Sequence, residues 1–248
     1  MSHLEQVGFF AAVAEANAAL VAGAAVLEVG SYDVNGSIRS VYSAAAKYVG
    51  VDLDHGPGVD VVAYGHQLDH PEGSYDVTIS GECFEHDPHW RKTFLNMVRM
   101  TRPGGLVAFT CASRGRAEHG TVRSDKTLSP GTQSAGLDYY RNLEERDFRD
   151  LPLDDVFSEY KFWYLPTHFD LFFAGVRRGG DHRARLPNDA TVAALSALMP
   201  WPYKTVMAPF RGLVKILPER HYQTVALPMW KALMPIIARL ERRRATAI

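Results

Sequence analysis

Hydrophobic positions in the first 111 residues follow two different spacings. Short apolar runs of strand length occur at residues 25–29, 48–52, 59–63, 75–80 and 105–111. Residues 3–22 repeat apolar side chains at helical spacing, and residues 35–46 and 88–101 are also suited to helices. Strands that alternate with helices predict a parallel sheet that is covered by helices on both faces.

A long polar segment, residues 112–137, follows the last of these runs and is rich in Gly, Ser and Arg. A loop of this length after a core strand is typical of a lid or a substrate-binding loop. A helix is expected near Tyr139–Arg149. Two further strand-like runs, residues 157–164 and 169–176, have only a short connection, so we expect them to pair antiparallel.

The turn after the first predicted strand carries the strongest chemical signal. Gly30 follows that strand, and an acidic residue, Glu28, stands two positions before it. Glycine lets a ligand approach the backbone and adopts a positive φ at little cost, and the amides of a following helix start can hold an anionic group. The next strand ends at Asp52, where a carboxylate can accept both hydroxyls of a ribose. The pattern predicts a site for a nucleoside cofactor.

Composition narrows the class of protein. The 248 residues suit one large domain or a domain with an appendage, and the formal charge of −1 predicts no broad affinity for nucleic acid. Cys83 and Cys111 lack a metal-ligand spacing and indicate a reduced, cytosolic chain. The N-terminal residues do not resemble a secretory signal, and no apolar run is long enough to predict a membrane span. We therefore expect a cytoplasmic protein.

Four sequence blocks carry a family resemblance: VLEVGSYDVNGS, YVGVDL, SYDVTISGECFEHDPHW and TRPGGLVAFT. Their order and spacing, closed by the final hairpin, resemble the class I S-adenosylmethionine-dependent methyltransferases, in particular the bacterial methyltransferase 11-type family. The resemblance implies a doubly wound α/β fold with a mostly parallel seven-stranded sheet, an antiparallel last strand and a helical C-terminal extension. It also implies S-adenosylmethionine as the cofactor.

The resemblance further implies which residues hold that cofactor, and all of them lie at or after the ends of predicted strands. They are Glu28, Gly30 and Ser31 at the amino-acid end, Asn35 and Gly36 in the loop, Asp52 at the ribose, Leu53, Gly65 and His66 at the adenine, and Ser80, Gly81 and Glu82 on the floor beside the transferred methyl. Two features depart from the family pattern. Tyr64 stands where relatives often have Asp, and Asp33 and Asn35, which tolerate left-handed backbone, stand among the expected glycines.

Methyl transfer from a sulfonium depends mainly on alignment and on exclusion of water. A base is needed only for a poorly acidic hydroxyl or a protonated amine, and the candidate catalytic residues are His86, Glu82 and His119. The ordinary pKa of histidine suits proton removal at neutral pH. Alternatively, residues 85–87 cap a helix that begins near Pro88, with Asp87 as the N-cap. No tight spacing of metal ligands occurs, so no metal site is expected.

The C-terminal part of the chain differs from the rest in charge. Residues 203–248 hold nine basic and two acidic residues, a formal charge of +7, beside apolar and aromatic segments. We expect a methyltransferase domain over residues 1–178 and a basic, apolar helical extension over residues 179–248. Three roles stay open for the extension: a cover over the substrate, a contact in a homodimer, or a peripheral membrane contact in which Trp and Leu enter the interface and arginines meet anionic lipid.

The sequence therefore predicts a cytoplasmic methyltransferase that acts on a small-molecule acceptor, with O-methylation of a sugar or a secondary metabolite favoured. No partner nucleic acid is expected, because no base-flipping signature of the Asn/Asp-Pro-Pro-Tyr type is present. Two alternatives stay open at this point. One is an NAD-dependent oxidoreductase that uses the same glycine turn, and the other is a non-catalytic scaffold that binds a nucleoside cofactor.

Overall fold

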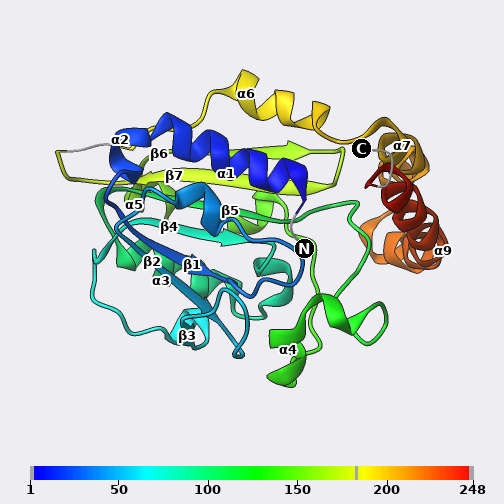
Figure 1. Cartoon of the computed structure of the whole chain (residues 1–248), viewed down its shortest axis with the longest axis horizontal. Helices are drawn as coiled ribbons and strands as arrows, with labels where there is room; N and C mark the ends of the chain where they lie inside the picture. The colour runs from blue at the N-terminus through cyan, green and yellow to red at the C-terminus, as the bar shows by residue number, and fades with distance from the viewer. Residues whose placement is uncertain (1–2, 182–183, 246–248) are drawn as a thin grey trace.

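The computed structural model describes residues 3–181 and 184–245, and one sheet organises them (Figure 1). Its seven strands lie in the order β3-β2-β1-β4-β5-β7-β6. The first five are parallel, whereas β7 runs antiparallel to both β5 and β6, which confirms the predicted fold class. The strands are β1 (Ala25–Val29), β2 (Lys47–Asp52), β3 (Val61–Val62), β4 (Tyr75–Gly81), β5 (Thr101–Ala112), β6 (Phe157–Leu165) and β7 (Asp170–Arg177).

Two apolar layers cover the faces of this sheet. Side chains alternate between the faces along each strand, so Val26 packs beneath α1 while the next residue, Leu27, packs on the face of α3. The α-helices are α1 (Leu4–Ala16), α2 (Ala18–Val21), α3 (Trp90–Met100), α4 (Pro130–Ser134), α5 (Leu153–Val156), α6 (Asp189–Ala194), α7 (Trp201–Val206), α8 (Ala208–Ile216) and α9 (Glu219–Ala245). The result is the predicted three-layer arrangement, with α1 lying across one face in Figure 1.

Aromatic packing explains why the last hairpin joins the sheet. Phe109 of β5 lies opposite Phe173 of β7 in the antiparallel register, and their rings stack with centroids 5.0 Å apart. Phe94 of α3 meets Phe173 edge-on at 5.5 Å. Such pairs add about 0.5–1.5 kcal/mol each to the effect of burial, so this cluster fixes β7 beside β5.

The prediction of a helix over residues 35–46 is wrong. That segment forms only a short 3₁₀ turn, η1 (Arg39–Tyr42). The Asp33 carboxylate accepts the N–H of Gly36 at 2.6 Å, and Gly36 has a φ of +127°, so the chain turns where a helix would begin. Short polar side chains compete in this way with helical hydrogen bonds.

The helix expected near Tyr139–Arg149 is also wrong, because its backbone bonds to other segments. The N–H of Arg141 donates to the backbone carbonyl of Glu85 at 2.8 Å, and the N–H of Leu143 donates to the backbone carbonyl of Ala112 at 2.9 Å. A short 3₁₀ turn, η5 (Glu145–Phe148), is all that forms there. Two smaller differences occur: the strand expected at 59–63 shortens to β3, and α3 begins after His89 as N-cap instead of after Asp87.

The C-terminal helices α7, α8 and α9 lie beside the tip of the β6–β7 hairpin and the loop after β5 (Figure 1). Phe169 at that tip is buried against Phe210 and Tyr222. Gln223 of α9 accepts the N–H of Glu118 at 2.9 Å and donates to the carbonyl of Arg116 at 2.8 Å. The extension thus braces the loop that follows β5. Across the described helices, none is both long and apolar enough to cross a bilayer.

Candidate functional site

A deep pocket opens at the carboxyl ends of β1, β2 and β4. It encloses about 1020 Å³, its open mouth included, which is at the upper end of the usual range for small-molecule sites. The strand order reverses between β1 and β4, and ligands of open α/β sheets bind at such a reversal. The position of this pocket therefore follows from the topology of the sheet.

The glycine turn forms one wall of the pocket and is tightly packed. Gly30 has a φ of +84°, and a Cβ built there would lie 2.5 Å from the Cβ of Cys83. The N–H groups of Gly30 and Ser31 both donate to the carbonyl of Val51, at 2.8 and 3.1 Å. The segment after this turn forms only the 3₁₀ turn η1 (Arg39–Tyr42), so the α-helix start that was expected to supply amides here is absent.

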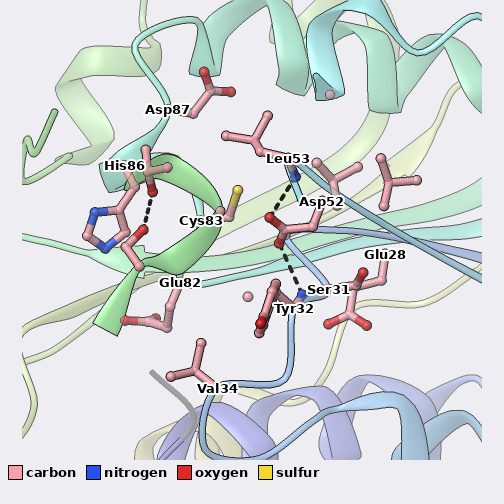
Figure 2. A pocket seen from close by; sticks show the side chains of 18 of the residues that line it. Glu28, Ser31, Tyr32, Val34, Asp52, Leu53, Glu82, Cys83, His86 and Asp87 are labelled. Carbon is pink, nitrogen blue, oxygen red and sulfur yellow. Dashed lines mark hydrogen bonds between the residues drawn. The ribbon is translucent and has the colours of Figure 1, made fainter. Parts of the chain in front are cut away.

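Asp52 projects into the middle of the pocket from the end of β2 (Figure 2). One carboxylate oxygen accepts the N–H of Tyr32 at 3.0 Å and the other accepts that of Leu53 at 2.7 Å. Burial raises the pKa of this carboxyl, while the two hydrogen bonds oppose the shift. Gly131 of α4 lies so close that a Cβ there would stand 2.3 Å from Asp52 Oδ1. The loop after β5 therefore closes over this carboxylate.

Glu28 lies beside the same turn, deep in β1. Its carboxylate accepts a hydrogen bond from the hydroxyl of Tyr48 at 2.6 Å. Burial raises the pKa of Glu28 to about 7, and the bond from Tyr48 and the nearby guanidinium of Arg39 oppose that shift. This residue can therefore accept hydrogen bonds as a carboxylate or donate one as a neutral acid near neutral pH.

The floor of the pocket carries a strained acidic residue. Glu82 has a φ of +52°, a left-handed conformation that is uncommon outside glycine. Its side chain is buried, and neither carboxylate oxygen has a hydrogen-bond partner among the described residues. The guanidinium of Arg116 lies 4.0 Å away, and burial raises the pKa of Glu82. Strained residues with unsatisfied polar groups concentrate at ligand sites.

The predicted histidines meet at the same end. The rings of His86 and His119 lie edge to face with centroids 5.0 Å apart, and both pack on Tyr140. His86 lines the pocket, whereas His119 does not. Burial lowers the pKa of His86 to about 3 and lowers that of His119 well below its ordinary value. Both rings are therefore neutral at physiological pH.

The structure gathers nearly all of the predicted site residues around this pocket. Those that line it are Glu28, Gly30, Ser31, Asn35, Gly36, Asp52, Leu53, Gly65, His66, Gly81, Glu82 and His86. Ser80 does not line it, because its hydroxyl donates to the carbonyl of Val29 at 2.8 Å inside the sheet.

One part of the wall escaped the sequence analysis. Gln6 reaches the pocket from α1, and its amide nitrogen lies against Gly81. This residue does not stand at a strand end, so no local pattern indicates its approach. Residues 128–132 also line the pocket, and they belong to the long segment after β5 that was expected to be a lid or a substrate-binding loop.

Comparisons with known proteins match part of this chain to methyltransferases. Residues 27–109 match the model of a family described as a methyltransferase domain. Uncharacterized methyltransferases of Mycobacterium marinum and Mycobacterium ulcerans are each 34% identical over 103 residues, which cover 36% of this chain and 40% of the relative. The chain thus spans about 40% of the length of the curated relatives that it matches.

Solved structures with a similar fold include two methyltransferases. A 1,6-didemethyltoxoflavin-N1-methyltransferase of Burkholderia thailandensis, solved with S-adenosylhomocysteine, is 18% identical, with a TM-score of 0.47 over 68% of this chain and 77% of that chain. Phosphoethanolamine N-methyltransferase 2 of Haemonchus contortus, solved with S-adenosylmethionine, is 16% identical, with a TM-score of 0.47 over 63% and 49% of the two chains.

Proposed function

We propose that the chain, whose residues 27–109 match a methyltransferase domain, transfers a methyl group from S-adenosylmethionine to a small-molecule acceptor. The observation that carries this proposal is the position of Asp52. Its carboxylate stands at the end of β2, in the middle of a pocket at the strand-order reversal. Two backbone N–H groups orient it, so it is held ready to accept the two hydroxyls of a ribose.

With the ribose placed at Asp52, the positions of the adenine and of the amino-acid end follow. Leu53 and His66 lie on the side of the pocket formed by β2 and η2 (Gly65–Gln67), where the adenine would fit. Glu28, Gly30 and Ser31 lie beside the other end of the turn. The carboxylate of Glu28 suits the ammonium of the amino-acid end, and the buried hydroxyl of Ser31, which has no hydrogen-bond partner among the described residues, can donate to its carboxylate.

The transferred methyl would then point to the end of the pocket that holds Glu82 and His86. When bound, S-adenosylmethionine would supply a methyl group on a sulfonium, so that an acceptor lone pair would form the new bond to carbon while the electrons of the carbon–sulfur bond return to sulfur. Water or Glu82 would take the acceptor's proton. Polar, unsatisfied groups at this end favour a hydroxyl acceptor, such as a sugar or another hydroxylated metabolite, over an apolar one.

The binding of two cofactors separates this proposal from its oxidoreductase alternative. Calorimetric titration should give stoichiometric binding of S-adenosylmethionine and none of NAD. Tritium from the labelled methyl group should then pass to an acceptor in a pool of bacterial small molecules. Binding of NAD instead would contradict the proposal, and cofactor binding without transfer to any acceptor pool would favour the scaffold.

A further inference from the structure

A second group of titratable side chains adjoins the pocket. Glu85 and His86 lie in the 3₁₀ turn η3 (Phe84–His86) after β4, and His119 comes from the loop after β5. All three are buried, and one potential ligand atom of each lies within 4.8 Å of the others. The Nε2 of His119 is 3.9 Å from Oε1 of Glu85.

These ligand atoms lack hydrogen-bond partners. Both carboxylate oxygens of Glu85, Nδ1 of His86 and Nε2 of His119 are buried with no partner within the described part of the chain. An unpaired buried polar group costs about 1–3 kcal/mol. Because one ligand atom of each residue lies within 4.8 Å of the others, a single bound ion can satisfy one such atom on all three residues.

The second nitrogen of His119 shows which kind of partner fits. Its Nδ1 lies 3.1 Å from the carbonyl of Ala117. A neutral ring that donates from Nδ1 to this carbonyl presents the lone pair of Nε2 to Glu85. Histidines that bind metals are usually oriented by just such a bond to a carbonyl.

We propose that Glu85, His86 and His119 bind one divalent transition-metal ion. Two imidazoles and one carboxylate form the protein part of many zinc and iron(II) sites, which keep further positions open. Ligand atoms of a tetrahedral site lie about 3.3 Å apart when metal–ligand bonds are about 2.0–2.1 Å. The observed spacing therefore has to contract by roughly one ångström, a shift that side-chain rotation supplies.

The chemistry of the three groups suits a transition-metal ion. Neutral imidazole nitrogens and carboxylate oxygens bind such ions, and here two imidazoles and one carboxylate each bring one ligand atom within 4.8 Å of the others. A harder ion such as Mg²⁺ prefers an all-oxygen shell, so the two nitrogens select the softer ions.

A neighbouring group of similar composition does not carry the same inference. His3, Glu5, His168 and Asp170 also lie within 4.8 Å of one another. Four of its atoms also lack hydrogen-bond partners among the described residues, but the carboxylate of Asp170 already pairs with the guanidinium of Arg116 at 3.2 Å. Its anionic charge is already balanced by a guanidinium, so a cation gains little at that position.

Such an ion would act at the wall of the cofactor pocket, because His86 lines that wall. Its open position can take an acceptor oxygen and lower the pKa of that hydroxyl. The hydroxyl then loses its proton to solvent, and the oxygen attacks the methyl carbon as described above. This catalytic part rests on the proposed function, whereas ion binding itself does not.

Metal binding to the 248-residue chain, after chelation has removed bound metal, tests the inference without any measurement of activity. Titration with Co²⁺ should give one site per chain, with the visible absorption of a four- or five-coordinate centre, and excess Mg²⁺ should not displace it. Variants His119→Asn and Glu85→Gln should bind at least about tenfold more weakly. Exposed His89→Asn should bind like wild type.

The outcomes separate this inference from the proposed function. Wild type without a stoichiometric Co²⁺ site overturns the inference, and so does a loss of binding in His168→Asn with none in His119→Asn. Should a variant fail to fold, the wild-type spectrum and its resistance to Mg²⁺ still decide. Binding of S-adenosylhomocysteine is measured in parallel. If it does not bind, the proposed function is overturned. If it binds but Co²⁺ does not, only the proposed metal site is overturned.

Discussion

Replacing Gly30 by alanine tests whether the glycine turn is as tightly packed as the structure shows. An alanine at a φ of +84° pays about 1–2 kcal/mol for left-handed backbone. Its Cβ would also stand 2.5 Å from the Cβ and 2.8 Å from the sulfur of Cys83. Such overpacking costs about 1–3 kcal/mol, so the free energy of unfolding should fall by about 2–5 kcal/mol.

The chain offers a matched control. Gly23 has a similar φ of +80°, but an added Cβ there meets no atom within 4 Å. Gly23→Ala should therefore lower the free energy of unfolding only by the cost of left-handed backbone, about 1–2 kcal/mol. The difference between the two variants isolates the contact with Cys83. Urea unfolding followed by circular dichroism measures both free energies.

A second substitution makes the cause explicit. Cys83→Gly removes both atoms that the new methyl group would strike, so in the double variant with Gly30→Ala the overpacking should vanish. Coupling of about 1–3 kcal/mol is expected between the two positions. Equal destabilisation by Gly30→Ala and Gly23→Ala, or an absence of coupling, would refute the packing described for this turn.

Two further predictions concern charge and the C-terminal extension. The pKa of Glu28 is raised from about 4.5 to about 7 in the folded state, so between these pH values the folded protein binds a proton that the unfolded chain releases, and the free energy of unfolding falls as pH rises. Glu28→Gln should reduce that fall, measured by urea unfolding at pH 5 and 8, by about 3 kcal/mol, and an unchanged fall would contradict the assignment. Gln223→Ala removes two hydrogen bonds to the loop after β5, so hydrogen exchange at the amide of Glu118 should accelerate about tenfold or more. Thr224→Ala, at an exposed position of the same helix, should leave that exchange rate unchanged, and equal rates in the two variants would show that α9 does not hold this loop.

Local patterns were sufficient for the sheet and for the centre of the site. Strand-length apolar runs predicted the strands, and the succession of Gly30 and Asp52 predicted two neighbouring positions at one sheet edge. Both predictions rest on spacing within a short segment. They hold because the carboxyl ends of parallel strands meet at the same edge.

What could not be predicted depends on contacts between distant segments. The backbone of Arg141 bonds to Glu85 instead of to its own turn, and this removes an expected helix. Similarly, His119 reaches Glu85 because the loop after β5 packs against η3, so no sequence spacing predicts the group. The approach of Gln223 to that loop depends on packing around Phe169 and Tyr222.

The most direct test of the central claim is a calorimetric titration of S-adenosylhomocysteine into wild type and Asp52→Asn. The substitution keeps the shape but removes the charge of the acceptor, and a hydrogen bond to a charged group contributes about 1.5–3 kcal/mol. Binding should therefore weaken by about tenfold or more. Asp54→Asn, just beyond the same strand end and outside the pocket wall, should bind like wild type. Equal affinity of Asp52→Asn and wild type would contradict the assignment of this pocket as the cofactor site.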